Sequence, residues 1–380
     1  MAGEQLTPRA LNRALLARQG LLTPWETPLV ETVESIGALQ AQYWPGVAVA
    51  LWSRMRDFAA QDLYAALAGR QLVVGTLLRA TLHMVSAREH PGYAAAVEAS
   101  GVTDWRRISK EPFPQMATLR SELLAWTAAV PRSGDEISEF VEEWLARHPG
   151  ALDEKELAFQ RQYKWRPFRG TSAFVRVAAD GRWERAPASL MAAPKSSEPA
   201  ASSPEEVLAA VVRRHLRAFG PAAADDVADW IGWKTPPVRA VLDRLAPELV
   251  RFEDAAGRAL YDLPAAPRPD PETPAPMRLL PGFDNVMLAY ASKRRQRVLP
   301  DEHREKVYVR ANLQVLPTFL VDGLIAGTWS VEEKRREATL TLRPFERLAR
   351  PVRAAVVEEA ERLVRFSQPA AKTHRVEVEP

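Results

Sequence analysis

Cysteine is absent from this 380-residue chain. Its absence excludes disulfide bonds, thiolate nucleophiles, cysteine-ligated zinc and iron–sulfur clusters. Histidine is scarce, with six residues at His83, His90, His148, His215, His303 and His374. No two of them have the i, i+3 or i+4 spacing with which a helix holds a metal ion. We therefore expect no metal site.

Long apolar runs and the common nucleotide-binding motifs are also missing. No stretch approaches the roughly 20 apolar residues that span a bilayer, and the start, MAGEQLTPRALNRALLARQG, lacks the apolar core and cleavage site of a secretory signal. The sequence has no G-x-G-x-x-G or G-x-x-x-x-G-K phosphate loop and no G-x-S-x-G nucleophile elbow. We therefore expect a cytoplasmic protein with no membrane partner and no cofactor.

The net charge of +3, from 51 basic and 48 acidic side chains, does not by itself indicate a polyanionic partner. Basic residues are instead concentrated in four short runs: Arg106, Arg107 and Lys110; Lys164, Arg166 and Arg169; Arg213, Arg214 and Arg217; Lys293, Arg294, Arg295 and Arg297. Each run alone is compatible with an ordinary solvated surface. Four of them on one chain favour a track for nucleic-acid phosphates.

The length suits two or three compact units of roughly 100 to 150 residues. The clearest unit covers residues 207–265, where a first helical pattern ends at Gly220. A second short helix carries Asp225 and Asp226 in its first turns, and a third begins with Thr235 as N-cap. The segment LVRFEDAAGRALYDL then predicts two strands about an Ala-Gly turn. Three helices followed by a hairpin is the order of a winged helix, whose third helix enters a major groove.

The same order recurs, more loosely, twice upstream. Residues 116–190 predict three helices and the strands SAFVRVA and RWERA, and residues 1–115 predict three helices and the strands VVGTLLR and TLHMVS. Residues 191–206, rich in Ala, Ser and Pro, indicate a linker. Residues 266–380 predict a β-rich region with a hairpin turn at Asp322-Gly323, the last basic run and a terminal helix. We therefore expect an α+β fold of three tandem winged-helix units and a β-rich C-terminal part.

Two glutamines, Gln40 and Gln42, stand in an apolar stretch where a helix gives way to a turn. One interpretation is that their amides cap the helix end. A second comes from five segments that resemble, in order, those of the HTH_42 winged-helix DNA glycosylases: ESIGALQAQYWPG, LLRATLHMVSAREHPGY, HLRAFGPAAADDVADWIGW, LLPGFDNVMLAYASKRRQRVL and VDGLIAGTW. In that family a Gln-Φ-Gln or Gln-Φ-Asp motif is catalytic, where Φ is a small or aliphatic residue. Gln40-Ala41-Gln42 is similar to the motif of the AlkZ-like, azinomycin-resistance branch.

The resemblance implies a C-shaped DNA-binding architecture and an enzyme of DNA repair or antibiotic self-resistance, which excises alkylated purines from double-stranded DNA. Alkylation at N7 of guanine makes the base cationic, so the leaving group needs little acid assistance. A glutamine carbonyl can then hold the attacking water, although it cannot act as a true general base. No lysine is placed by motif to form a Schiff base, which favours a monofunctional enzyme. We expect a monomer that associates with the nucleoid through DNA.

The resemblance also implies that six further side chains contact DNA: Arg79, His83, Lys293, Arg294, Arg295 and Arg297. A hydrogen-bonded core position is an equally good interpretation for His83, and a solvated hairpin position for Arg79. Four tryptophans at helical or strand spacing favour core positions over stacking with bases: Trp165, Trp183, Trp230 and Trp233.

The alternative function is that of a non-catalytic winged-helix transcriptional regulator. The predicted recognition helix, KTPPVRAVLDRLAPE, argues against it, because Asp243 and Glu248 offset its basic residues and it has no Asn or Gln to read adenine. A protein-interaction scaffold is a third alternative, which leaves the basic runs and the glutamine pair without a purpose.

Overall fold

The computed structural model of the chain describes residues 4–100, 116–184, 189–195, 203–311 and 313–379. Its contacts divide it into two compact units. The first unit, here unit 1, comprises Met1–Ala60, Val212–Trp230 and Lys234–Pro380. The second, unit 2, comprises Gln61–Val211 and Ile231–Trp233. Each unit is thus assembled from segments that are distant in the sequence.

Unit 1 begins with two short strands and three helices: β1 (Glu4–Leu6), α1 (Pro8–Arg18), α2 (Leu29–Ile36), β2 (Leu39–Gln40) and α3 (Trp44–Trp52). Helix α1 starts where the sequence favours a start, since the Thr7 hydroxyl accepts the N–H of Ala10 and Pro8 fills the first position. Helix α3 was not predicted. Its Pro45-Gly46 pair suggests a turn, but proline is well tolerated in a first helical turn.

The predicted order of three helices and a hairpin is present in the segment 204–262. Its elements are α10 (Pro204–Phe219), which runs from unit 2 into unit 1, α11 (Ala224–Ile231), α12 (Thr235–Arg244), the 3₁₀ turn η3 (Ala246–Glu248), β7 (Val250–Asp254) and β8 (Ala259–Asp262). Strands β7 and β8 are antiparallel, with Gly257 at φ +75° in their turn, and β1 pairs with β7 in parallel. The prediction of Thr235 as N-cap was wrong: Lys234 holds that position and Thr235 is already helical.

The C-terminal part of unit 1 is built on a five-stranded sheet in the order β15-β14-β13-β12-β9. Its elements are β9 (Arg278–Leu280), α13 (Asn285–Leu288), η4 (Ser292–Arg297), η5 (Asp301–His303), α14 (Arg304–Val307), β10 (Tyr308–Val309), β11 (Gln314–Val315), β12 (Thr318–Val321), β13 (Leu324–Lys334), β14 (Glu337–Pro344), α15 (Arg350–Ser367) and β15 (Thr373–Val378). The predicted hairpin turn at Asp322-Gly323 is confirmed. Strand β15 was not predicted.

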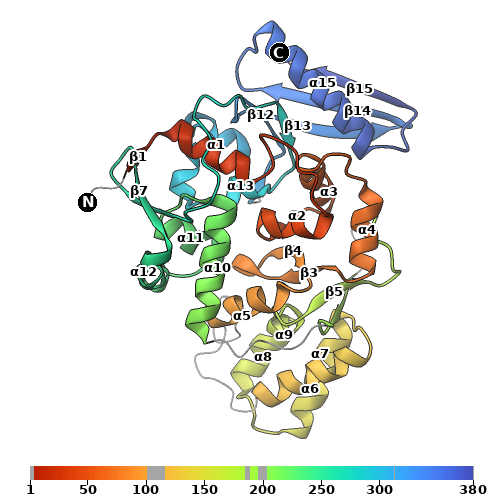
Figure 1. Cartoon of the computed structure of the whole chain (residues 1–380). Helices are drawn as coiled ribbons and strands as arrows, with labels where there is room; N and C mark the ends of the chain where they lie inside the picture. The colour runs from red at the N-terminus through yellow and green to blue at the C-terminus, as the bar shows by residue number, and fades with distance from the viewer. Residues whose placement is uncertain (1–3, 101–115, 185–188, 196–202, 312, 380) are drawn as a thin grey trace. The chain divides into compact units, whose positions relative to one another are not determined.

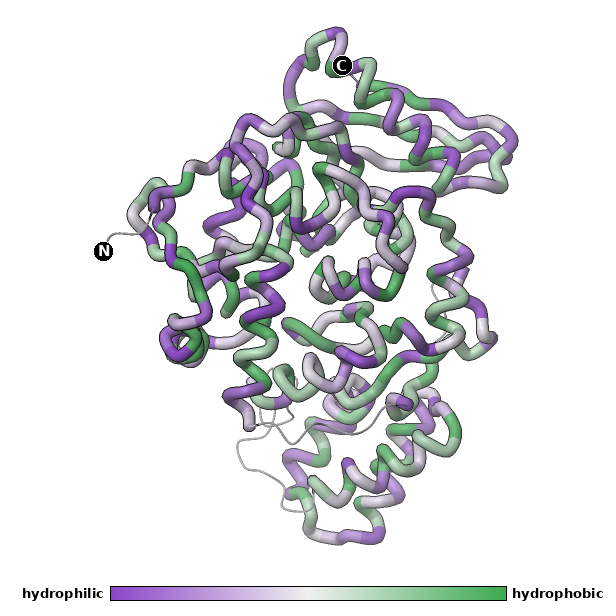
Figure 2. Tube along the Cα trace, in the orientation of Figure 1, coloured by the Kyte–Doolittle hydropathy of each residue, from purple (hydrophilic) through white to green (hydrophobic). Residues whose placement is uncertain are grey.

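Helix α15 covers one face of this sheet (Figure 1). Its Val356, Ala360 and Leu363 pack with Trp329 and Leu340 in one buried core. Hydrophobic and hydrophilic residues alternate along these strands (Figure 2), which is the pattern of a sheet with one covered face. The burial of these side chains is the main source of stability for the region.

Unit 2 contains the remaining elements: α4 (Ala60–Ala68), β3 (Leu72–Thr76), η1 (Leu78–Ala80), β4 (Leu82–Ser86), α5 (His90–Ser100), α6 (Met116–Ala129), α7 (Gly134–Arg147), α8 (Glu154–Gln162), α9 (Arg166–Arg169), β5 (Val175–Ala178) and β6 (Ser189–Ala192). Its strands follow the order β4-β3-β5-β6 and are antiparallel. Helix α7 begins with a capping box between Ser133 and Glu136. Trp144, Trp165 and Phe168 lie at the centre of the helical core.

The predicted second strand of this region was wrong. Residues 182–184 of the segment RWERA form no strand, and its last two residues lie outside the described part of the chain. The partner of β5 is instead β6, which takes in residues 191–192 of the predicted linker. The predicted mixture of helices and strands is confirmed across the described residues. The boundaries 1–115, 116–190, 191–206, 207–265 and 266–380 and their winged-helix character stay predictions.

Candidate functional site

The glutamine pair lies in the segment that connects α2 to α3. The C-cap of α2 is Gly37, at φ +80°, and Ala38 follows at φ +63°, so two successive residues adopt the left-handed conformation. The backbone then becomes extended at Leu39 and Gln40, and α3 starts at Trp44. Both glutamines therefore follow the end of α2 and stand outside its last turn.

Burial alternates along this segment. Ala41 is only 3% exposed, whereas Gln40 is half-buried and Gln42 is exposed. Tyr43, directly after the pair, is 48% exposed, which is high for an aromatic residue. Ala41 thus anchors the segment in the core, whereas Gln42 and Tyr43 are exposed to solvent.

Asn285, which no sequence motif singled out, contacts the same segment. The backbone N–H of Gln40 donates a hydrogen bond to Asn285 Oδ1 at 3.2 Å, and Asn285 Nδ2 donates to the carbonyl of Ala38 at 3.1 Å. This residue is 4% exposed and lies 245 positions from Gln40. No local sequence pattern could have identified such a contact.

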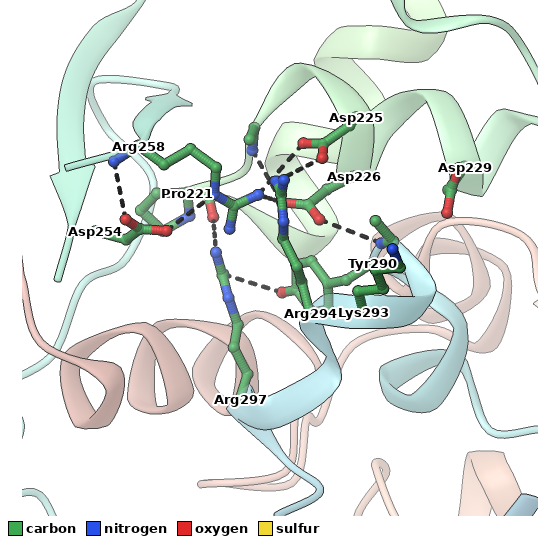
Figure 3. Close-up of polar contacts among 12 residues, drawn as sticks. Pro221, Asp225, Asp226, Asp229, Asp254, Arg258, Tyr290, Lys293, Arg294 and Arg297 are labelled. Atoms are coloured by element: carbon green, nitrogen blue, oxygen red, sulfur yellow. Dashed lines mark hydrogen bonds and ion pairs between the residues drawn. The ribbon is translucent and has the colours of Figure 1, made fainter. Parts of the chain in front are cut away.

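The basic segment Ser292–Arg297 forms the 3₁₀ turn η4 beside the start of α11 (Figure 3). Arg294 pairs with Asp225 at 2.5 Å, and the same carboxylate accepts Arg258 at 3.3 Å. Asp226 accepts the backbone N–H of Ala291 at 3.2 Å, which attaches the start of the turn to α11. Acidic residues of α11 therefore offset much of the charge that the sequence suggested for phosphates.

The four cations of this segment differ in exposure. Lys293 is exposed, and Arg294 and Arg295 are half-buried. Arg295 lies over the ring of Tyr308, with 4.9 Å between guanidinium carbon and ring centre. Arg297 is 7% exposed and donates to the carbonyl of Pro221 at 2.6 Å and to the Tyr290 hydroxyl at 3.2 Å (Figure 3). These contacts give Arg297 a packing role, and DNA binding by this side chain stays a prediction.

Arg79 and His83, both in unit 2, are brought together by the turn between β3 and β4. Arg79 and Ala80 have φ of +55° and +57°, and Thr81 N–H donates to Leu78 O at 3.2 Å, which is the geometry of a type I′ turn. Arg79 Nη2 lies 3.5 Å from His83 Nε2. The turn therefore fixes the distance between the two side chains.

His83 is fully buried and neutral. Its Nδ1 lies 3.0 Å from the carbonyl of Thr81, which can only accept, so Nδ1 carries the proton. Burial, and then the charge of Arg79, lower the pKa of His83 from 6.5 to about 3. Burial also lowers the pKa of His90, to about 4. The core interpretation of His83 is thereby confirmed, and DNA contact by His83 or Arg79 stays a prediction.

The other candidate residues have mostly structural surroundings. Trp165, Trp183 and Trp230 are buried, which confirms the core interpretation for these three. Trp233 is half-buried and donates to the carbonyl of Ala96 at 3.0 Å. Arg213 pairs with Glu248 at 2.8 Å. The run at Arg106, Arg107 and Lys110 lies outside the described residues.

In the described part of the chain, no group of three or more His, Asp or Glu side chains is arranged to hold a metal ion. None of the helices described is both long and apolar enough to cross a bilayer.

Comparisons with known proteins agree with one another. The profile of a family described as "DNA glycosylase AlkZ-like" matches residues 33–366. The chain is 26% identical over 370 residues to the interstrand DNA cross-link repair glycosylase of Streptomyces sahachiroi, covering 93% of this chain and 94% of that protein. Its fold is similar to the solved structure of Streptomyces sahachiroi DNA glycosylase AlkZ, with a TM-score of 0.79 and 20% identity over 99% of this chain and 100% of that one.

Proposed function

The chain belongs to the AlkZ-like DNA glycosylases, and from this premise we propose that Gln40 and Gln42 catalyse hydrolysis of the N-glycosidic bond of cationic alkylated purines in duplex DNA. The family assignment bears out the resemblance noted in the sequence, and the protein is a DNA glycosylase of DNA repair. The observation that carries the proposal is the position of the motif of this family, Gln40-Ala41-Gln42. The motif lies in the segment that connects α2 to α3, and its last residue, Gln42, is exposed.

The chemistry of the substrate explains why two amides suffice. A purine alkylated at N7 or N3 carries positive charge, so its departure as a neutral base needs no proton from the enzyme. The enzyme has then to place a water on the opposite face of the sugar and to stabilise an oxocarbenium-like transition state. A glutamine carbonyl accepts a hydrogen bond from that water, and the amide NH₂ can hold a phosphate or a backbone group.

The same argument sets the substrate range and the product. An amide does not titrate near neutral pH, so it offers no general acid for an uncharged leaving group. Neutral lesions such as uracil should therefore remain in the DNA. No lysine of the motif is available for a Schiff base, so the product is an abasic site with intact strands.

We also propose how the enzyme holds DNA and which lesions it reaches. Lys293, the exposed cation of η4, contacts a phosphate, and the half-buried Arg295 adds positive charge beside it, whereas Asp225 offsets the charge of Arg294. The relative from Streptomyces sahachiroi is named for interstrand cross-link repair. Bulky N7 adducts and cross-links are therefore the substrates to test after simple N7-alkylguanine.

The decisive experiment measures excision of N7-methylguanine from a duplex under single-turnover conditions. Alkali converts each abasic site into a strand break, which is counted on a gel. Gln40→Ala and Gln42→Ala should each slow excision at least ~10-fold, a cost of about 1.4 kcal/mol in activation free energy. A uracil-containing duplex serves as the uncharged control. Wild-type activity in the double variant would contradict the proposal.

A further inference from the structure

The segment before the glutamine pair is held by a side chain that imitates a neighbouring strand. The amide of Asn285 offers one acceptor and one donor, and both are used on the backbone, at Gln40 N–H (3.2 Å) and Ala38 O (3.1 Å). The amide orientation is fixed by these partners, because an N–H can only donate and a carbonyl can only accept. Since Asn285 is 4% exposed, both bonds are protected from water, and losing either partner leaves a buried group unsatisfied.

The backbone at this point needs such a restraint. Ala38 has a φ of +63°, and the left-handed region is strained for a residue that carries a Cβ. Conformations of this kind persist where the surroundings enforce them, and they cluster at functional sites. Asn285 holds the carbonyl of the strained residue itself. On the other side, Gly37 packs so closely that a Cβ there would lie 3.0 Å from Ala218 Cβ.

Asn285 is in turn fixed by a buried ion pair. The guanidinium of Arg54 donates to the two oxygens of Asp284 at 2.7 and 2.9 Å, and both side chains are fully buried. Asp284 also accepts the N–H of Val286 at 3.1 Å, as the N-cap of the turn of α13 that begins with Asn285. Arg54 follows α3, the helix that the glutamine pair precedes. Asn285 thus contacts the chain at Ala38 and Gln40, and its neighbour Asp284 contacts Arg54, which follows α3.

The loop before Asn285 also contacts the far side of the motif. A Cβ on Gly46, in the first turn of α3, would lie 3.0 Å from Pro281 Cβ and 3.5 Å from Gly282 O. The sequence Pro281–Asn285 thus contacts the chain on both sides of the glutamines. This loop is the structural support of the motif within unit 1.

We propose that Asn285 is a positioning residue for base excision: it fixes the backbone from which Gln40 and Gln42 act, and the Arg54–Asp284 pair keeps it in place. The inference rests on the proposed function of the two glutamines. A glutamine amide can only orient the attacking water, so the excision rate depends on where the amide is held. A misplacement of about 1 Å can lower the rate on the order of 10²-fold. Loss of the Asn285 bonds should therefore lower the rate of the chemical step and leave affinity for DNA unchanged.

The chain offers a matched control in Asn12. This residue is also buried, at 3% exposure, and its Nδ2 donates to two backbone carbonyls of unit 1, those of Arg297 (2.6 Å) and Gly323 (2.8 Å). Asn12→Ala therefore removes similar bonds at a place with no contact to the motif. Both variants should lower the melting temperature, but only Asn285→Ala should slow single-turnover excision of N7-methylguanine, by about 10-fold or more. Dissociation constants for an undamaged duplex should match that of the wild type.

Two further variants keep the test decisive. Asn285→Leu preserves the size and branching of the buried side chain and loses both hydrogen bonds, so it should fold and still excise slowly. In a Gln40→Ala/Gln42→Ala background, Asn285→Ala should lower the residual rate by less than about 2-fold, because the residue acts through the two glutamines.

The outcomes separate this inference from the function on which it rests. A wild-type rate in folded Asn285→Ala or Asn285→Leu, or an equal loss of rate in Asn12→Ala, overturns the positioning role. The same holds if the Asn285 effect persists in full without Gln40 and Gln42. Full activity of the glutamine variants instead overturns the proposed function, whatever Asn285 does.

Discussion

Removing the charge of Asp284 should destabilise the protein far more than removing a charge from an equally well-formed surface pair. The Arg54 and Asp284 side chains have no exposed surface and share two hydrogen bonds of 2.7 and 2.9 Å. Asp284→Asn keeps the shape but leaves the guanidinium buried without its counter-charge. Breaking one partner of such a pair costs about 3–5 kcal/mol, and the remaining amide oxygen places this variant near the lower end.

A domain with about 5–15 kcal/mol of stability survives this loss, so the variant should be folded and measurable. Urea unfolding, followed by tryptophan fluorescence, gives the free energy of unfolding of each variant. The control is Glu248→Gln, which removes the charge from the exposed pair with Arg213, whose bonds of 2.8 and 2.9 Å have the same geometry. Its urea midpoint should remain close to that of the wild type, because water replaces the lost interaction.

Asp284→Asn should also slow excision, because the ion pair with Arg54 that holds the loop of Asn285 is lost. Equal unfolding free energies for Asp284→Asn and Glu248→Gln would refute the reasoning from burial. A destabilised Asp284→Asn with an unchanged excision rate would refute only the link from the ion pair to the glutamine motif.

Two more predictions concern pH and salt. The pKa of His83 is about 3 and that of His90 about 4 in the folded protein against 6.5 when unfolded, so stability should be independent of pH above 6.5 and fall below it, by about 2 kcal/mol per histidine at pH 5. Urea titrations at pH 7 and 5 should show about half of this loss in His83→Gln, and an unchanged loss would contradict a neutral buried imidazole. Lys293→Ala should reduce the slope of log affinity for DNA against log salt by about 1 without changing the melting temperature. Arg297→Ala should instead lower the melting temperature. A lower salt slope in Arg297→Ala and a lower melting temperature in Lys293→Ala would contradict phosphate binding by Lys293 and packing by Arg297.

Local signals in the sequence predicted local structure well. Helix α1 is one of the three helices predicted in residues 1–115, and the predicted turn at Asp322-Gly323 joins β12 to β13. Strand β15 was missed because α15 separates it in the sequence from its partner β14, and only the folded chain pairs the two strands in parallel. Strand β6 escaped for a related reason, since a segment rich in Ala and Ser gains its β structure from pairing with β5.

The candidate site was predictable only in part. Resemblance selected the glutamine pair, but no pattern in the sequence separates an exposed lysine from a buried arginine four residues later. Arg297 is buried, and it donates hydrogen bonds to Pro221 and Tyr290. Lys293, by contrast, is exposed. Asn285 could not be found at all, because its partners lie about 245 residues earlier and reveal themselves only through the hydrogen bonds of the fold.

The central claim is that two amides at the end of a strained, clamped segment catalyse excision of a cationic base. The most direct measurement is the single-turnover rate of N7-methylguanine excision by Gln42→Ala, with the affinity for the same duplex measured alongside. Gln42→Ala should excise at least ~10-fold more slowly than the wild type at unchanged affinity. A wild-type rate at unchanged affinity would contradict it.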